Sequence, residues 1–157
     1  MRMMRKICVA VKDARSEVEV EAAKKLAAED LAQVRALHVW LWEGFGRARF
    51  AVERPDEATF VADASVFELR MAGVGAHGVV RRAPVDAIAQ AIVDDAAAWG
   101  ADLIIVGPSH RKGLARWVNR GTAHRVTQLA SCPVVVATAP AGGHAKRVAV
   151  VEDVFRQ

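Results

Sequence analysis

The sequence is poor in cysteine and has no long apolar run, and both features exclude whole classes of protein. Only two cysteines, Cys8 and Cys132, occur among the 157 residues, and each lies in or beside a β-branched run. Free cysteine behaves as a small buried apolar side chain, and cytosolic thiols stay reduced, so we expect no disulfide. The apolar runs are far shorter than the roughly 20 residues of a membrane-spanning helix. We therefore expect no association with a membrane.

The first residues lack the apolar core of a secretory signal peptide. Residues 1–6 are basic, but the apolar run that follows them ends at Lys12 and Asp13. A signal peptide carries an apolar segment of roughly 7–15 residues after its basic start. The sequence therefore predicts a cytoplasmic protein.

Motifs of dedicated catalytic and metal sites are absent too. The sequence has no Gly-x-Ser-x-Gly elbow, no Walker loop with its lysine, no His-Glu-x-x-His pair and no Cys-x-x-Cys pair. The five histidines form no cluster at metal-ligand spacing, so we predict no metal site. No motif places a nucleophile or carboxylate around His110, which favours an ordinary loop histidine over a phosphate donor or a general acid. We therefore predict that the protein is not a dedicated enzyme.

Acidic side chains are missing from a long stretch of the C-terminal half. None lies between Asp102 and Glu152, in a chain whose net charge is +4. A region of one sign attracts anions such as phosphate or nucleic acid, and the alternative is a solvated basic face without a partner. No nucleic-acid-binding motif accompanies the charge, so nucleic acid is the least favoured partner. The basic residues of this stretch are Arg111, Lys112, Arg116, Arg120, Arg125, Lys146 and Arg147.

Short β-branched runs alternate with segments of helical periodicity along most of the chain. This alternation is typical of βαβ units, whose right-handed crossovers place helices on both faces of a parallel sheet. We therefore predict one three-layer α/β/α domain over residues 1–140, and a tail at 141–157 that is either an extra strand or a disordered end. Ser16 and Glu19 form a capping-box pattern at the start of the first helix. The expected strands are 7–11, 34–42, 78–81, 103–106 and 133–137, the expected helices are 16–31, 56–71, 84–99 and 122–129, and 43–46 is an expected loop.

Four segments, taken in their order and spacing, resemble the universal stress protein family. They are residues 37–39 in the second strand, 100–107 around the fourth strand, 113–126 in the loop and helix that follow, and 131–136 in the closing strand. The resemblance runs from about residue 6 to residue 137. It implies a five-stranded parallel sheet of order 3-2-1-4-5, as in adenine nucleotide alpha hydrolase-like folds. It also implies a homodimer, commonly formed through the last strand, and a protein partner that the sequence does not identify.

The resemblance further implies a place for a nucleotide. Family members that bind ATP or AMP, with magnesium accompanying ATP, carry a glycine loop of pattern G-x2-G-x9-G-(S/T) after the fourth strand. Glycines let the backbone approach a phosphate, and backbone N–H groups at a helix N-terminus then hold the anion. Thr122 begins the helix after the loop, where it is either a ligand contact or an N-cap. The implied site residues are Lys12, Asp13, Val39, Gly107, His110, Gly113, Gly121, Thr122 and Ala123.

The sequence departs from the family pattern at several of these positions. Lys12 stands where binders carry an aspartate, and Asp13 is displaced by one residue. His110 replaces the second glycine, Pro108 removes a backbone donor, and the loop is one residue longer than the family's. Basic loop side chains could replace the lost donors with charge-assisted contacts.

Two functions follow from this mixture of retained and altered positions. The first is a stress-response protein that binds an adenine nucleotide and hydrolyses ATP at most weakly, which the retained Gly107, Gly121 and Thr122 favour. The alternative is a dimeric protein-interaction module of the same family that binds no nucleotide, which the departures favour. We take nucleotide binding as the leading prediction.

Overall fold

Five parallel strands form the centre of the sheet in the computed structural model, which describes residues 3–13, 16–45, 48–51, 53–107, 121–138 and 149–154. Their order across the sheet is β4-β2-β1-β5-β6, with parallel pairing at every step. Counted along the chain, this order is 3-2-1-4-5, so the predicted topology is confirmed. The bounds are β1 Lys6–Val11, β2 Gln33–Phe45, β4 Ala76–Pro84, β5 Leu103–Val106 and β6 Val134–Thr138.

Two antiparallel strands extend this sheet beyond the prediction. β3 (Ala48–Ala51) pairs with the end of β2, from Trp42 opposite Ala51 to Phe45 opposite Ala48. The loop predicted at 43–46 is therefore wrong over 43–45, because the antiparallel partner supplies hydrogen bonds that let β2 continue through Gly44. β7 (Ala149–Val154) pairs with β6, so this part of the tail forms the extra strand.

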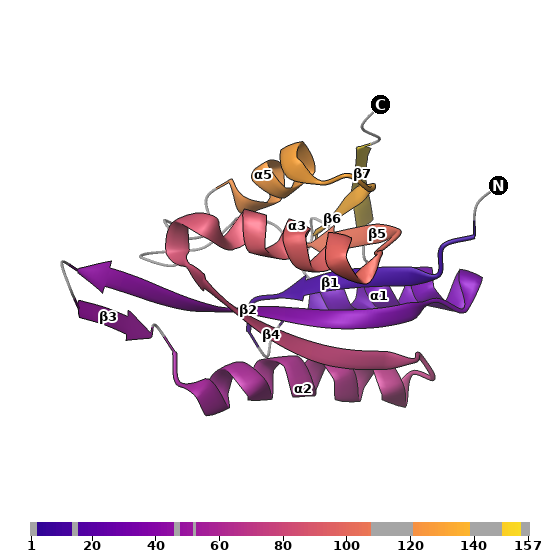
Figure 1. The fold of residues 1–157 in the computed structure, drawn as a ribbon. Helices are drawn as coiled ribbons and strands as arrows, with labels where there is room; N and C mark the ends of the chain where they lie inside the picture. The colour runs from indigo at the N-terminus through magenta and orange to yellow at the C-terminus, as the bar shows by residue number, and fades with distance from the viewer. Residues whose placement is uncertain are drawn as a thin grey trace.

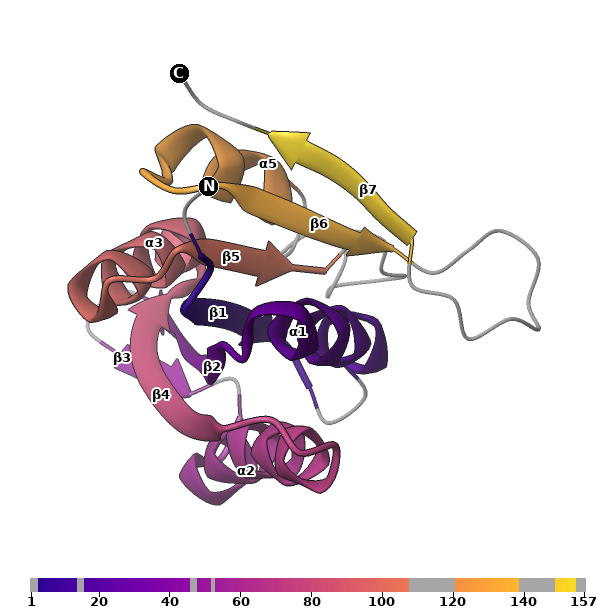
Figure 2. The same cartoon turned by 90° about the vertical axis from the view of Figure 1, so that its right-hand side faces the viewer.

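α-Helices of the described part of the chain cover both faces of the sheet (Figure 1). α1 (Glu17–Asp30) and α2 (Pro55–Met71) lie on one face, and α3 (Ile88–Trp99) and α5 (Thr122–Leu129) lie on the other (Figure 2). The predicted helix 84–99 starts later than expected. Pro84 ends β4 with extended backbone (ψ 155°), and the short 3-10 turn η1 (Val85–Ala87) precedes α3.

The predicted capping box at the start of α1 does not form. The Ser16 hydroxyl instead accepts hydrogen bonds from the backbone N–H groups of Lys12 (2.9 Å) and Asp13 (3.4 Å). Ser16 thereby closes the turn between β1 and α1, while Glu19 is buried elsewhere. The Ser16 hydroxyl, which the pattern would use for the helix end, thus holds the backbone just after β1.

Alternation along the central strands divides the core into two layers. Ile7, Val9 and Ile105 are buried with α1 and α2, whereas Cys8 and Ile104 are buried with α3 and α5. Strands covered on both faces need apolar residues at every position, which explains the unbroken β-branched runs. The layer under α3 and α5 extends to the carboxyl ends of the strands, and a cavity opens there.

Candidate functional site

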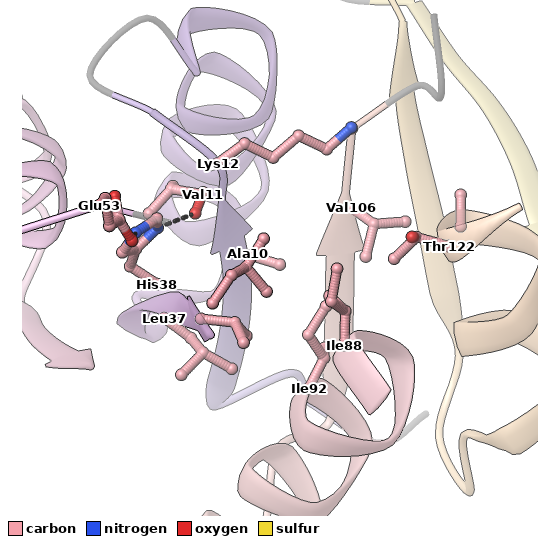
Figure 3. A pocket seen from close by; sticks show the side chains of 14 residues that line it. Ala10, Val11, Lys12, Leu37, His38, Glu53, Ile88, Ile92, Val106 and Thr122 are labelled. Carbon is pink, nitrogen blue, oxygen red and sulfur yellow. Dashed lines mark hydrogen bonds and ion pairs between the residues drawn. The ribbon is translucent and has the colours of Figure 1, made fainter. Parts of the chain in front are cut away.

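A cavity of about 200 Å³ lies at the carboxyl ends of β1 and β5 and beside the middle of β2 (Figure 3). The chain runs from β1 to β2 on one side of β1, and β5 lies on its other side. The cavity is therefore at the point where the strand order reverses, which is the usual ligand site of open α/β sheets.

The walls of the cavity are mostly apolar, and the period of each element explains which side chains line them. Leu37, Val39 and Leu41 alternate along β2 and face the cavity, as period-two geometry requires. Ile88 and Ile92, four residues apart, present one side of the first turns of α3. Ala10, Val11, Val106 and Ala123 complete the apolar lining. Such a surface suits a flat, largely apolar group.

A histidine and a glutamate supply polar groups at one side of the cavity. The Nδ1 atom of His38 lies 2.8 Å from the carbonyl oxygen of Val11, so Nδ1 is the donor in that hydrogen bond. Its Nε2 atom lies 2.5 Å from a carboxylate oxygen of Glu53. Trp40 donates from its indole to the carbonyl oxygen of Glu53 at 2.9 Å, so Glu53 is anchored at both backbone and side chain.

The N-terminus of α5 faces the same cavity. Gly121 precedes this helix with φ +78°, a left-handed conformation that glycine adopts without strain. Thr122 and Ala123, the first two residues of α5, line the cavity, and Figure 3 shows the Thr122 side chain beside Val106. The backbone N–H groups of a first helical turn have no partner within the helix and favour an anion.

Gly107, at the end of β5, is packed against a buried carboxylate. A Cβ atom at residue 107 would overlap the side-chain carboxylate of Glu19, which comes from α1 and is 4% exposed. Glycine is required here for close approach rather than for a positive φ. On the cavity side, the Lys12 side chain extends from the end of β1 toward the end of β5 (Figure 3).

The structure brings most of the predicted site residues together. Lys12, Val39, Gly107, Thr122 and Ala123 line the cavity, and Gly121 directly precedes Thr122. Asp13 follows Lys12 but is not among the lining residues. The predicted His110 and Gly113 lie outside the described residues.

Two polar residues of the cavity were not predicted. His38 lay within the segment 37–39 that carried the family resemblance, so its place beside Val39, a predicted site residue, was a usable signal. Glu53 had no such signal, because it follows β3, a strand that the sequence did not predict. Its approach to His38 depends on the β2–β3 hairpin.

A second charged cluster lies nearer the beginning of β2. Asp95 of α3, whose side chain is 2% exposed, accepts hydrogen bonds from Arg35 (3.0 Å) and Arg81 (2.8 Å). Arg35 also donates from Nε to His77 Nε2 at 3.0 Å and stacks over the Trp99 ring at 4.7 Å. Burial, followed by the charge of Arg35, lowers the pKa of His77.

The cysteines form no disulfide among the described residues. Cys8 and Cys132 are both free, and burial raises the pKa of Cys8 to about 12. Within the described ranges, no group of three or more His, Cys, Asp or Glu side chains could hold a metal ion. No helix in those ranges is long and apolar enough to cross a membrane.

The fold and the position of the cavity define a doubly wound α/β protein with a cavity at the switch point of its sheet. The family model for the universal stress protein family matches residues 3–138. The chain therefore belongs to the universal stress protein family. Among curated proteins, no sequence matches it significantly.

Solved structures with the same fold include several universal stress proteins. One from Archaeoglobus fulgidus has 23% identity and a TM-score of 0.65, covering 84% of this chain and 97% of that one. The universal stress protein from Archaeoglobus fulgidus in complex with dAMP has 24% identity and a TM-score of 0.61, with coverages of 86% and 98%. A universal stress protein family protein from Arabidopsis thaliana with AMP bound has 17% identity and a TM-score of 0.59, with coverages of 90% and 97%.

Proposed function

We propose that the cavity binds the nucleoside part of an adenine nucleotide in a cytoplasmic stress-response protein. The observation that carries the proposal is the cavity itself, at the switch point and beside the N-terminus of α5. Structures of similar proteins that hold dAMP and AMP support the class of ligand. The proposal concerns binding, with ATP hydrolysed at most weakly and magnesium accompanying ATP.

The size of the cavity favours a nucleoside over a whole triphosphate. About 200 Å³ is below the roughly 300–1,000 Å³ typical of sites that enclose a drug-sized ligand. We therefore assign the enclosed space to the base and sugar, and place the phosphates outside it, toward Lys12 and the first turn of α5. A lysine and free helical N–H groups both favour phosphate oxygens.

The lining residues then have distinct roles in the proposed complex. The apolar side chains of β2 and α3 enclose the base and exclude water. Glu53 is oriented by His38 and keeps a carboxylate at the cavity wall, where it accepts hydrogen bonds from an exocyclic amine or from sugar hydroxyls. Thr122 contributes a hydroxyl that both donates and accepts.

A specific observation favours the alternative, an interaction module without a nucleotide. The Glu19 carboxylate packs against Gly107 at the start of the segment that carries the family's phosphate loop. A carboxylate beside a phosphate raises the cost of binding through repulsion. The two proposals differ most for ATP, which brings the most negative charge to this place.

Thermal melts with adenosine, AMP and ATP separate the two functions. A ligand that binds only the folded chain raises the free energy of unfolding by about 2.7 kcal/mol at 100 times its Kd, which is about 5–10 °C for a domain of this size. Ala123→Phe should abolish the rise, because the new ring fills the cavity. His124→Phe, at the exposed neighbouring position, is the matched control and should keep it.

The outcomes of these melts have distinct meanings. A rise with AMP or adenosine that only Ala123→Phe removes supports nucleoside binding in the cavity. The absence of a rise with all three ligands contradicts the proposal and leaves the interaction module. A rise that survives Ala123→Phe places binding outside the cavity and also contradicts it.

A further inference from the structure

Helix α2 carries large apolar side chains on the side that faces away from the sheet. Phe60, Phe67 and Met71 are 62%, 65% and 72% exposed. The inward side of the same helix is already mostly apolar, with five apolar residues, among them Ala62 and Val66, and Ser65 buried. A surface helix normally has one apolar stripe and an opposite polar face. The second stripe of α2 is therefore not needed for the fold of one chain.

The outward side chains repeat with the spacing of a helix–helix seam. Phe60, Ala64, Phe67 and Met71 are separated by four, three and four residues, which is the a/d spacing of a coiled coil. Ala64, between the two phenylalanines, is half-buried. α2 lies at the outside of the molecule in Figures 1 and 2, so its outer side is open to another helix. We name these four residues the α2 seam.

We propose that the α2 seam joins two copies of this chain as an antiparallel helix pair with two-fold symmetry. With the axis at the middle of the seam, Phe60 of each copy packs on Met71 of the other. Phe67 of each copy packs on Ala64 of the other, so that a large side chain meets a small one in the central layers. A two-fold interface needs a surface that complements itself, and this order of large and small residues does so.

Charges beside the α2 seam complement each other in the same arrangement. Asp63 and Arg70 lie along one flank, each directly before a seam residue. In the antiparallel pair, Asp63 of one copy lies opposite Arg70 of the other, which gives two equivalent ion pairs. Arg70 is already oriented by donating from Nε to the carbonyl oxygen of Ala76 at 3.0 Å. On the opposite flank, Glu68 pairs with Lys24 of its own chain at 3.6 Å. A parallel pair would instead place like charges together.

The outer edge of β6, an alternative surface for a second copy, is already covered in this chain. The outer edge of β6 is hydrogen-bonded to β7 of the same chain. Pairing of two copies through β6, which the sequence led us to expect, would require β7 to leave. The α2 seam needs no such rearrangement. Its three large side chains expose about 400 Å² per copy, half of the about 800 Å² per partner in a standard interface, so we expect micromolar affinity.

Sedimentation velocity of the full chain tests the proposal, from about 1 µM to about 200 µM, which brackets a micromolar dissociation constant. We expect a concentration-dependent dimer. Phe67→Glu should raise its dissociation constant about 30-fold or more, because a central large side chain is lost. Leu31→Glu is the matched control, since Leu31 is 91% exposed outside α2, and it should leave the constant unchanged.

A charge exchange tests the antiparallel arrangement separately from hydrophobic association. Asp63→Arg should raise the dissociation constant about 10-fold by placing two arginines together at each end. Adding Arg70→Asp to it should restore the wild-type constant within about 3-fold. Thermal melts show that each variant is folded. A monomer throughout the concentration range, a dimer unaffected by Phe67→Glu, or an exchange that restores nothing overturns the proposal.

Discussion

Strand β2 contributes Arg35 near its beginning to one charged cluster and His38 in its middle to another, and the two clusters differ in how fully their carboxylates are enclosed. The Asp95 side chain is 2% exposed and accepts from Arg35 and Arg81. The Glu53 side chain is 22% exposed, pairs with His38 and lines a cavity. A carboxylate whose oxygens are all used within the fold stabilises the chain, whereas one at a cavity wall retains capacity for a ligand. Burial of charge alone therefore does not identify a site.

The largest expected effect comes from removing the enclosed carboxylate. Asp95→Ala leaves the half-buried Arg35 without its counter-charge and should lower the free energy of unfolding by about 3 kcal/mol. Asp94→Ala is the matched control at the exposed neighbouring position, where we expect a change within about 0.5 kcal/mol. Urea denaturation measures both. Equal losses for the two variants would remove the structural role assigned to Asp95.

Removing the carboxylate of Glu53 should cost less stability than removing that of Asp95, but it should weaken nucleotide binding more. Glu53→Ala should cost about 1 kcal/mol of stability, since a partly exposed hydrogen-bonded pair is lost. It should also reduce the AMP-induced rise in melting temperature, which Asp95→Ala should leave intact. Thermal melts of both variants with and without AMP make the comparison. If Asp95→Ala reduced the rise and Glu53→Ala did not, the assignment of Asp95 to stability and of Glu53 to ligand binding would be wrong.

The smallest expected effect is a pH dependence at the enclosed cluster. The folded pKa of His77 is lowered, so the unfolded chain binds a proton more readily than the folded chain does. The contribution of neutral His77 to the free energy of unfolding is therefore complete above the unfolded pKa of about 6.5, and it is lost as the pH falls below that value. Between about pH 7.5 and about pH 5.5, the wild type should lose more melting temperature than His77→Asn does. Parallel losses would show that His77 does not contribute.

The sequence predicted the parallel sheet well because its signals are local. The runs in β1 and β5 are apolar at every position, and helical spacing in α3 ends at Gly100, so each element is visible without its neighbours. The hairpin of β2 and β3 was missed because its pairing depends on a partner strand that carries no strong pattern. The capping box failed for a related reason, since Ser16 is used by the backbone of Lys12 instead.

Part of the site was predicted from the sequence, and there is a physical reason why the other part was not. Thr122 could be placed because helix starts converge at the switch point of this topology. Val39 could be placed because residues 37–39 resemble the family's second strand. The contact of Glu53 with His38 joins segments whose distance is set by the unpredicted hairpin. Spacing along the chain contains no information on such a contact, so only the folded structure reveals it.

The contact between Gly107 and Glu19 has a consequence for how sequences of this kind diverge. Any side chain at residue 107 would displace the Glu19 carboxylate, so the two positions cannot change independently. Relatives that keep a long acidic residue at the position of Glu19 should keep glycine at that of Gly107, and those with a small residue at the first should tolerate alanine at the second. A pair that varies together in this way records spatial proximity. Evolution at the first residue of the loop is thus tied to a helix on the other side of the sheet.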